Sequence, residues 1–246
     1  PHSAADASGD IAGGQMNGFL ARVRVAQRIA ARYGCPTNTV NPICASLGSP
    51  DVMGYHDARE ISNYWAYAHN FVLQDHMFAP NASWSLPAHL FLVSEWSAIC
   101  ARAGDPLSCR NALDTPQDPT STTPDYAWTD LTYLLHKAGV SWAYYVNGGS
   151  APDCANDAMV CTLTSQGAST PGIWNPLPYF DTVHQDREAG NIQDISHFYQ
   201  VAHQGTLPAV SWIIPNGDVS EHPPALVTAG QNYVTGLINA LMRGPD

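Results

Sequence analysis

Ser85 lies where an apolar helical run begins, in the segment Ser85-Leu-Pro-Ala-His-Leu90. A helix N-terminus offers free N–H groups and a partial positive charge. A hydroxyl there loses its proton more easily, and a phosphate oxyanion can be held beside it. Serine is also a preferred N-cap residue, and proline is favoured in the first turn of a helix. The local pattern alone favours the cap and leaves a nucleophile as the alternative.

His222 belongs to the segment Pro215-Asn-Gly-Asp-Val-Ser-Glu-His-Pro-Pro224, which follows an apolar run that predicts a strand. Loops at the carboxyl ends of strands are where α/β sheets place their sites. The two prolines after His222 restrict its backbone. A restrained histidine on such a loop suits phosphate contact or proton transfer. The structural alternative, which the pattern alone favours, is a loop histidine packed on aromatic side chains.

Further histidines fall near Asp75 and Ser85, at positions 56, 69, 76 and 89. A metal cluster is conceivable there, because histidine is a common metal ligand. No His-x-x-x-His pair, however, comes with a carboxylate at a suitable position. Positions on the surface or on a helix face are therefore the favoured interpretation.

The six cysteines fall into close pairs, and each pair flanks a loop rich in Pro, Gly, Asn or Asp: Cys35 and Cys44, Cys100 and Cys109, Cys154 and Cys161. Local disulfides are the simplest interpretation, although six cysteines allow other pairings. None of the pairs has the Cys-x-x-Cys spacing of zinc or redox sites. Disulfides predict a secreted or periplasmic protein. Buried free thiols in a cytosolic enzyme are the alternative.

The composition narrows the class of protein. The chain has 246 residues, 45% of them hydrophobic and 13% charged, with a net charge of −11. These values argue against disorder and against a nucleic-acid binder, which needs a basic surface. No apolar run is long enough to span a membrane. The acidic balance disfavours strong attraction to anionic membranes and leaves room for transient contact with a membrane surface.

Hydrophobic periodicity predicts the elements that position Ser85 and His222. Helices are expected over residues 14–33, 58–72, 85–97, 127–138, 195–204 and 226–242, and strands over 140–146 and 207–214. This order favours an α/β fold with helices on the faces of a mostly parallel sheet. No segment resembles a linker, so residues 1–246 are expected to form a single domain. Ser85 and His222 are expected together at the carboxyl edge of the sheet.

Several ordered motifs resemble one known family. They are His2-Ser3 with Gly14-Gln-Met-Asn-Gly-Phe19, Met53-Gly-Tyr-His56, Leu73-Gln-Asp-His-Met-Phe78, the Ser85 segment, Trp142-Ala-Tyr144, Leu207-Pro-Ala-Val-Ser-Trp-Ile-Ile-Pro-Asn216, Ser220-Glu-His-Pro-Pro224 and Gly230-Gln-Asn-Tyr-Val234. The family is that of bacterial phosphoesterases of the phospholipase C and acid phosphatase type, within the alkaline-phosphatase-like superfamily. The resemblance covers nearly the whole chain.

The resemblance implies an alkaline-phosphatase-like α/β/α sandwich and a hydrolase that acts on phosphoric esters. Ser85 would be the nucleophile and would form a phospho-enzyme intermediate. His222 would contact the phosphoryl group, and His2 would face the same pocket. Asp75 matches an aspartate of structural character, whereas Ala88 replaces an asparagine frequent in relatives.

The resemblance also implies a divalent metal ion, with Ser85 as a ligand. Other ligands of the family lie in a Glu-Asn segment and an Asp-Asp segment, and neither is found in this chain. The expectation is a truncated domain whose sheet is incomplete at both ends and whose remaining metal ligands lie outside the chain. Two alternatives stay open: a phosphate-binding fragment or pseudoenzyme, and a secreted binding module stapled by disulfides.

Overall fold

The computed structural model describes residues 4–32, 52, 54–114, 124–156 and 161–245. The chain divides into two compact units, one of residues 1–59 with 158–161 and the other of residues 60–157 with 162–246. Each unit is described by itself. The single domain expected from the sequence stays a prediction.

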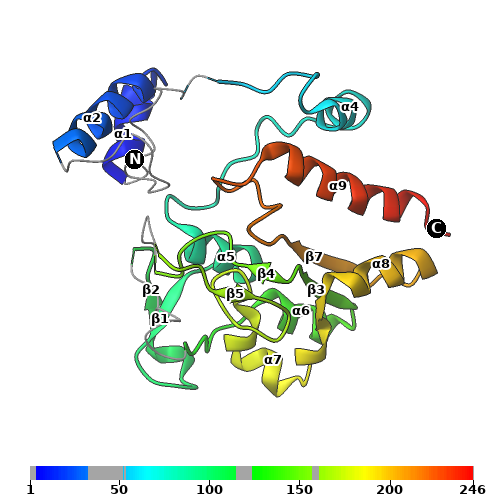
Figure 1. Ribbon diagram of the computed structural model, residues 1–246. Coiled ribbons are helices and arrows are strands. Elements are labelled where there is room, and N and C mark those ends of the chain that lie inside the picture. The colour runs from blue at the N-terminus through cyan, green and yellow to red at the C-terminus, as the bar shows by residue number, and fades with distance from the viewer. Residues whose placement is uncertain (1–3, 33–51, 53, 115–123, 157–160, 246) are drawn as a thin grey trace. The chain divides into compact units, whose positions relative to one another are not determined.

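The first unit contains two helices, α1 (Ala4–Ile11) and α2 (Phe19–Arg32), joined through a short 3-10 turn, η1 (Ala12–Gly14) (Figure 1). The helix expected from residue 14 begins only at Phe19, because Gly13 and Gly14 have φ values of 67° and 94°. The helices approach closely at Gly18, where a Cβ atom would lie 1.8 Å from the Gly9 carbonyl oxygen. Helix α1 was not expected from the sequence.

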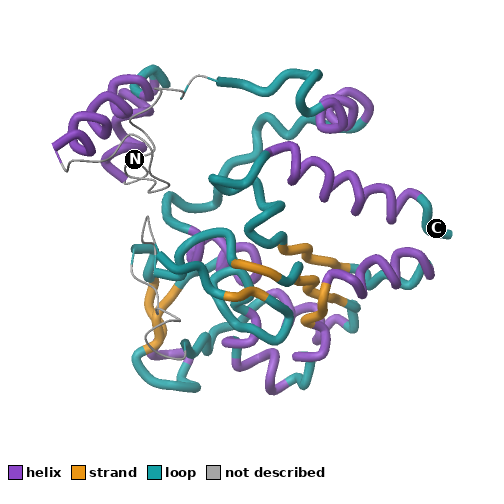
Figure 2. The backbone as a smooth tube through the Cα atoms, viewed as in Figure 1, coloured by secondary structure: helices purple, strands orange, loops and turns teal. Residues whose placement is uncertain are grey.

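The second unit is built on a parallel sheet. Among the described residues, its strand order is β6 (Ile192–Asp194), β3 (Trp142–Val146) and β7 (Val210–Ile214). Figure 2 draws the strands of the protein in orange. Strand β3 pairs with β7 in parallel, from Trp142 opposite Val210 to Val146 opposite Ile214. The parallel pairing expected for the two strands is confirmed. Strand β6 was not expected, since its three residues are too short for a periodic signal.

Helices pack on both faces of this sheet. Strand β3 is buried throughout, and its residues alternate between two apolar clusters. Ala143 and Tyr145 pack with side chains of α8 (Ile195–Gln204) and α9 (Val227–Met242). The alternate β3 residues join a cluster with side chains of α5 (Ser85–Ser94), α6 (Leu131–Ala138) and α7 (Asp181–Gln185). The α/β class is therefore confirmed, and the alkaline-phosphatase-like sandwich stays a prediction.

Helix ends differ from the expected bounds for local reasons. Helix α6 starts at Leu131 because the Asp130 side chain accepts from the Tyr133 N–H group at 2.8 Å, which makes Asp130 the N-cap. Helix α5 stops at Ser94 because Glu95 has a left-handed φ of 55°. Helix α8 has the predicted bounds, with Asp194 as its N-cap.

Helix α4 (Ser62–Asn70) lies against α9 and receives its N-terminal cap from that helix. The Gln231 side chain accepts from the N–H groups of Asn63 at 2.9 Å and of Tyr64 at 3.3 Å. A residue far along the chain thus satisfies the free donors at the start of α4. This contact is why α4 begins near residue 62 rather than at the expected residue 58.

Two short antiparallel strand pairs, β1–β2 and β4–β5, lie in segments for which no strand was expected from the sequence. Their strands are β1 (Ala98–Cys100), β2 (Cys109–Asn111), β4 (Gly149–Ser150) and β5 (Ser165–Gln166). The remaining 3-10 turns are η2 (Pro106–Ser108), η3 (Leu177–Tyr179) and η4 (Ala189–Asn191). None of the described helices is both long and apolar enough to cross a membrane.

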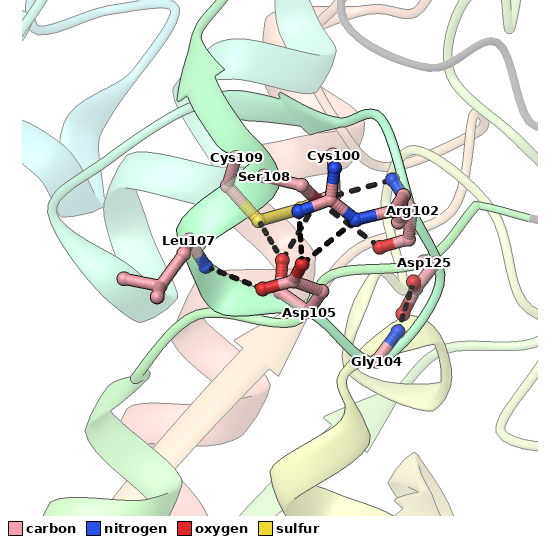
Figure 3. Close-up of polar contacts among 8 residues, drawn as sticks. All are labelled: Cys100, Arg102, Gly104, Asp105, Leu107, Ser108, Cys109 and Asp125. Atoms are coloured by element: carbon pink, nitrogen blue, oxygen red, sulfur yellow. Dashed lines mark hydrogen bonds and ion pairs between the residues drawn. A yellow bond between two sulfur atoms is a disulfide. The ribbon is translucent and has the colours of Figure 1, made fainter.

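The disulfide between Cys100 and Cys109 closes the β1–β2 hairpin, as predicted (Figure 3). Within its loop, Asp105 accepts from the Leu107 N–H group at 3.0 Å and pairs with Arg102, which holds the pKa of the Asp105 carboxyl below its usual value. Cys154 and Cys161 are also disulfide-bonded. Cys35 and Cys44 lie outside the described residues, so their pairing stays a prediction.

Candidate active site at the carboxyl edge of the sheet

Ser85 is the first residue of α5, and Trp84 occupies the N-cap position with φ −94° and ψ −173°. The Ser85 hydroxyl does not cap the helix. It donates a hydrogen bond to the Asp153 carboxylate, at Oδ2. The interpretation of Ser85 as an N-cap residue is therefore wrong, and its oxygen is directed toward an acidic side chain.

The Asp153 carboxylate is held through both of its oxygens. Oδ2 accepts from Ser85, and Oδ1 accepts from the Trp174 indole N–H group at 2.7 Å. The carbonyl oxygen of Trp174 accepts in turn from the Tyr144 hydroxyl at 2.9 Å. Tyr144 is fully buried in β3. The position of the Ser85 hydroxyl is thus fixed, through two residues, from the central strand of the sheet.

His89 lies one turn after Ser85 on α5, and its ring centroid is 4.3 Å from that of Trp174. Its Nδ1 atom is buried and has no hydrogen-bond partner among the described residues. Burial lowers the pKa of His89 to about 4, and the nearby Asp153 charge opposes that shift only in part. His89 is therefore a neutral ring at neutral pH and places no cation beside Asp153.

The loops that follow β3 and β7 are joined directly to each other. The Gly217 N–H group donates to the Ser150 carbonyl at 2.8 Å. The Gln166 side-chain amide donates to the carbonyl oxygens of Asn147, at 3.0 Å, and Pro215, at 2.8 Å. Parallel strands end at the same edge of a sheet, so the loops that carry Asp153 and His222 start side by side.

His222 is exposed on the loop after β7. Its N–H group donates to the Ser220 hydroxyl at 3.1 Å. The preceding residue, Glu221, has a left-handed φ of 63° and accepts from the Tyr64 hydroxyl of α4 at 2.6 Å. Burial and the Glu221 contact raise the pKa of Tyr64 above its usual value. Exposure argues against the interpretation of His222 as a packed loop histidine.

The loop of His222 packs against α9 at residue 230, where a side chain would collide with Glu221. A Cβ atom at residue 230 would lie 2.2 Å from Cγ of Glu221. Only glycine leaves room for that side chain to reach Tyr64. Contacts with α4 and α9 therefore fix the backbone immediately before His222.

The remaining histidine candidates are His2, His56, His69 and His76. His2 lies outside the described residues. His56, His69 and His76 are exposed, and His76 hydrogen-bonds to the exposed Asp75 at 2.9 Å. The expectation of surface histidines holds for these three residues.

Asp153 and Trp174 were missed by the sequence analysis, because residues 147–175 are rich in Pro, Gly, Ser, Thr and Asp and show no hydrophobic period. A single carboxylate and a single indole in such a segment carry no spacing signal. The position of Asp153 beside the paired Cys154 was the one available hint, because a disulfide restrains its neighbours.

The residues around Ser85 do not make a complete metal centre. Within the described ranges, the one group of three potential His, Cys, Asp or Glu ligands is His136, Asp186 and Glu188. Glu188 accepts from the indole of Trp142, the first residue of β3, at 2.9 Å, so this group lies at the opposite end of that strand. At Ser85 the structure offers a hydroxyl and the Asp153 carboxylate. A divalent ion at Ser85 thus stays a prediction from the resemblance.

The Ser85 hydroxyl contacts Asp153 in the segment after β3, and His222 lies on the loop after β7. Loops at the carboxyl ends of parallel strands are where α/β proteins place their sites. A site shared by Ser85 and His222 stays a prediction. The whole chain, residues 1–246, matches the Phosphoesterase family. The protein belongs to that family.

Curated relatives are phospholipases C. A non-hemolytic phospholipase C of Pseudomonas aeruginosa is 26% identical over 202 residues, which cover 79% of this chain and 26% of the relative. Phospholipase C B of Mycobacterium tuberculosis is 23% identical over 201 residues, covering 80% of this chain and 35% of the relative. A hemolytic phospholipase C of P. aeruginosa is 24% identical over 206 residues, covering 80% and 28%. The chain therefore spans about a quarter to a third of the length of these relatives.

Proposed function

We propose that this protein hydrolyses phosphoric esters with Ser85 as its nucleophile. The observation that carries the proposal is the Ser85 hydroxyl itself. It stands at the first residue of α5, is not used as a cap, and donates to a carboxylate. Membership of the Phosphoesterase family supports the reaction class.

In the proposed reaction, Ser85 Oγ attacks phosphorus. The Oγ–P bond forms as the bond from phosphorus to the leaving oxygen breaks, which gives a phosphoserine and an alcohol. Water then attacks the phosphoserine and releases phosphate or a phosphorylated headgroup. The free N–H groups at the start of α5 stabilise the phosphoryl charge. His222, on the neighbouring loop, contacts the phosphoryl group or gives a proton to the leaving oxygen.

The proposed substrates are phospholipids with a zwitterionic headgroup or soluble phosphate esters. The relatives are named phospholipase C, which supports a lipid substrate. The net charge of −11 disfavours anionic lipids. A run of exposed apolar side chains after α4 offers contact with a lipid surface: Phe71, Val72, Leu73, Met77 and Phe78.

We also propose that the protein acts outside the cytoplasm. The disulfide between Cys100 and Cys109 and the bonded state of Cys154 and Cys161 support an oxidising compartment. Divalent-metal dependence is part of the same proposal and comes from the resemblance. Chelation of the full-length protein followed by restoration with single divalent ions tests it.

Substitution of the two candidate residues in the full-length protein tests the proposed reaction. Ser85→Ala should lower kcat/KM for p-nitrophenyl phosphate and for a choline phospholipid on the order of 10³-fold or more, because the covalent route disappears. His222→Ala should cost about 10²-fold.

Ser83→Ala and His203→Ala are matched controls, since both side chains are exposed and lie outside the site. They should leave the rate within about 3-fold of the wild type. A Ser85→Ala variant that keeps wild-type activity contradicts the proposal. The pseudoenzyme alternative predicts a different result, in which the wild-type protein binds phosphate and shows no turnover.

A further inference from the structure

We infer that Asp153 is the general base that removes the Ser85 proton and that Trp174 positions it. The inference rests on the proposed function, because it assigns a role within the same reaction. It concerns a residue that no motif in the sequence singled out.

The geometry gives Asp153 a defined orientation. Its Oδ2 faces the attacking atom, the Ser85 hydroxyl oxygen, and its Oδ1 faces the Trp174 indole N–H group at 2.7 Å. The residues on either side, Pro152 and Cys154, are buried, and Cys154 is disulfide-bonded. A carboxylate anchored in this way meets the positional demand of proton transfer, which needs hydrogen-bond reach to the proton.

The groups around Asp153 favour a role as proton acceptor over a role in an ion pair. No Lys or Arg side chain among the residues placed in the structure forms a salt bridge with Asp153. Its two partners are neutral donors, a hydroxyl and an indole. His89, which contacts Trp174, is neutral at neutral pH. Among the described residues, no basic side chain pairs with the Asp153 carboxylate, and its Oδ2 atom is placed to accept the Ser85 proton.

The proton and electron pairs balance over the reaction. As Ser85 Oγ forms its bond to phosphorus, its proton passes to Asp153 Oδ2, and the electron pair of the breaking P–O bond stays on the leaving oxygen. That oxygen takes a proton from His222 or from water. In the second step, water attacks phosphorus and gives a proton to the solvent or His222, the Oγ–P bond breaks, and Asp153 returns its proton to Ser85. Asp153 ends the cycle as a carboxylate.

Trp174 acts through Asp153 and is a positioning residue. Its indole fixes one oxygen, so the other oxygen points at Ser85, and its backbone is fixed by the buried Tyr144 hydroxyl. Without the indole N–H group, the carboxylate gains rotational freedom. Small displacements of a catalytic group are enough to slow the reaction severely.

The test uses rapid acid quench of the full-length protein to measure phosphorylation of Ser85 separately from turnover. Asp153→Asn keeps the shape and the Trp174 contact but removes the base. It should slow phosphorylation on the order of 10²–10³-fold with KM within about 3-fold, and it should abolish the solvent deuterium isotope effect on this step. Asp153→Glu should recover part of the rate.

Trp174→Phe should slow phosphorylation about 10-fold, because it removes the indole donor and keeps the ring. Trp128→Phe is the matched control, since the Trp128 indole donates to Ser94 at 3.0 Å and does not touch Asp153. Thermal unfolding of each variant shows whether it folds. If Asp153→Asn does not fold, the comparison of the Trp174→Phe and Trp128→Phe phosphorylation rates tests the inference.

Phosphorylation by Asp153→Asn at the wild-type rate overturns the inference, as does a Trp174→Phe rate equal to that of Trp128→Phe. These outcomes are distinct from failure of the proposed function. If the function itself is wrong, Ser85→Ala stays active and the wild-type protein forms no phosphoserine at all.

Discussion

The Ser85 hydroxyl illustrates how the same residue supports opposite interpretations until its partner is known. Serine before an apolar helical run is most often a cap, and the sequence pattern favoured that role. In the structure Trp84 occupies the cap position, and the Ser85 hydroxyl donates to Asp153. The interpretation of Ser85 changes because of one contact, between two residues that are 68 positions apart in the sequence. No local sequence pattern reveals such a contact.

His89 should make the stability of the protein sensitive to acid. Its pKa is about 4 in the folded protein and 6.5 in its ordinary state, so the unfolded chain binds a proton more readily between these values. The stabilisation is fully present above pH 6.5 and is lost as the pH falls toward about 4. The loss amounts to up to about 3 kcal/mol.

Urea unfolding of wild type and His89→Gln across this pH range measures the effect. The difference in unfolding free energy between the two proteins should shrink as the pH falls from 7 to 4. A difference that stays constant over the range means that His89 is not held neutral by burial.

Helix α9 does more than cover the sheet, because it also fixes the loop of His222. Gly230→Ala should force Glu221 to move, since the added Cβ would lie 2.2 Å from its Cγ atom. We expect a loss of about 1–3 kcal/mol in unfolding free energy and a lower kcat/KM through displacement of His222.

Gly236→Ala is the matched control on the same helix, because its added Cβ would lie 3.4 Å from the Tyr199 hydroxyl, an ordinary contact. It should leave stability unchanged or raise it slightly, as alanine is the better helix former. Equal effects of the two substitutions would show that Glu221 adapts freely, and the proposed support of His222 by α9 would then be wrong.

Long periodic elements were predictable from the sequence, and β3 and β7 were expected from short runs rich in β-branched and aromatic residues. Strand β6 and helix α7 were missed, because three and five residues give too little periodicity. Predicted bounds failed where a distant or left-handed residue sets the end, as Gln231 does for α4 and Glu95 does for α5.

Within the candidate site too, some residues could be predicted from the sequence and others could not. Ser85 and His222 came from the sequence because motifs and strand ends mark such residues. Asp153 and Trp174 did not, because their roles depend on how an aperiodic segment folds back onto α5. Residues whose function arises from a tertiary contact are visible only once the contact is known.

The molecule as a whole belongs to a family whose named relatives are three to four times longer than the matched segment. The described part supplies a sheet edge, a nucleophile candidate with its carboxylate, and a histidine loop. Around Ser85 it does not supply three side chains of the kinds that bind metals. Covalent chemistry at Ser85 is therefore the claim on which the proposed activity depends.

The most direct measurement is the identity of the phosphorylated residue during turnover. The full-length protein is mixed with excess substrate, quenched in acid within its steady state, digested, and mapped by mass spectrometry. We predict phosphate on Ser85, formed in the wild type and absent from Ser85→Ala. Rapid substrate turnover without phosphate on Ser85, or with phosphate on another residue, would contradict the account.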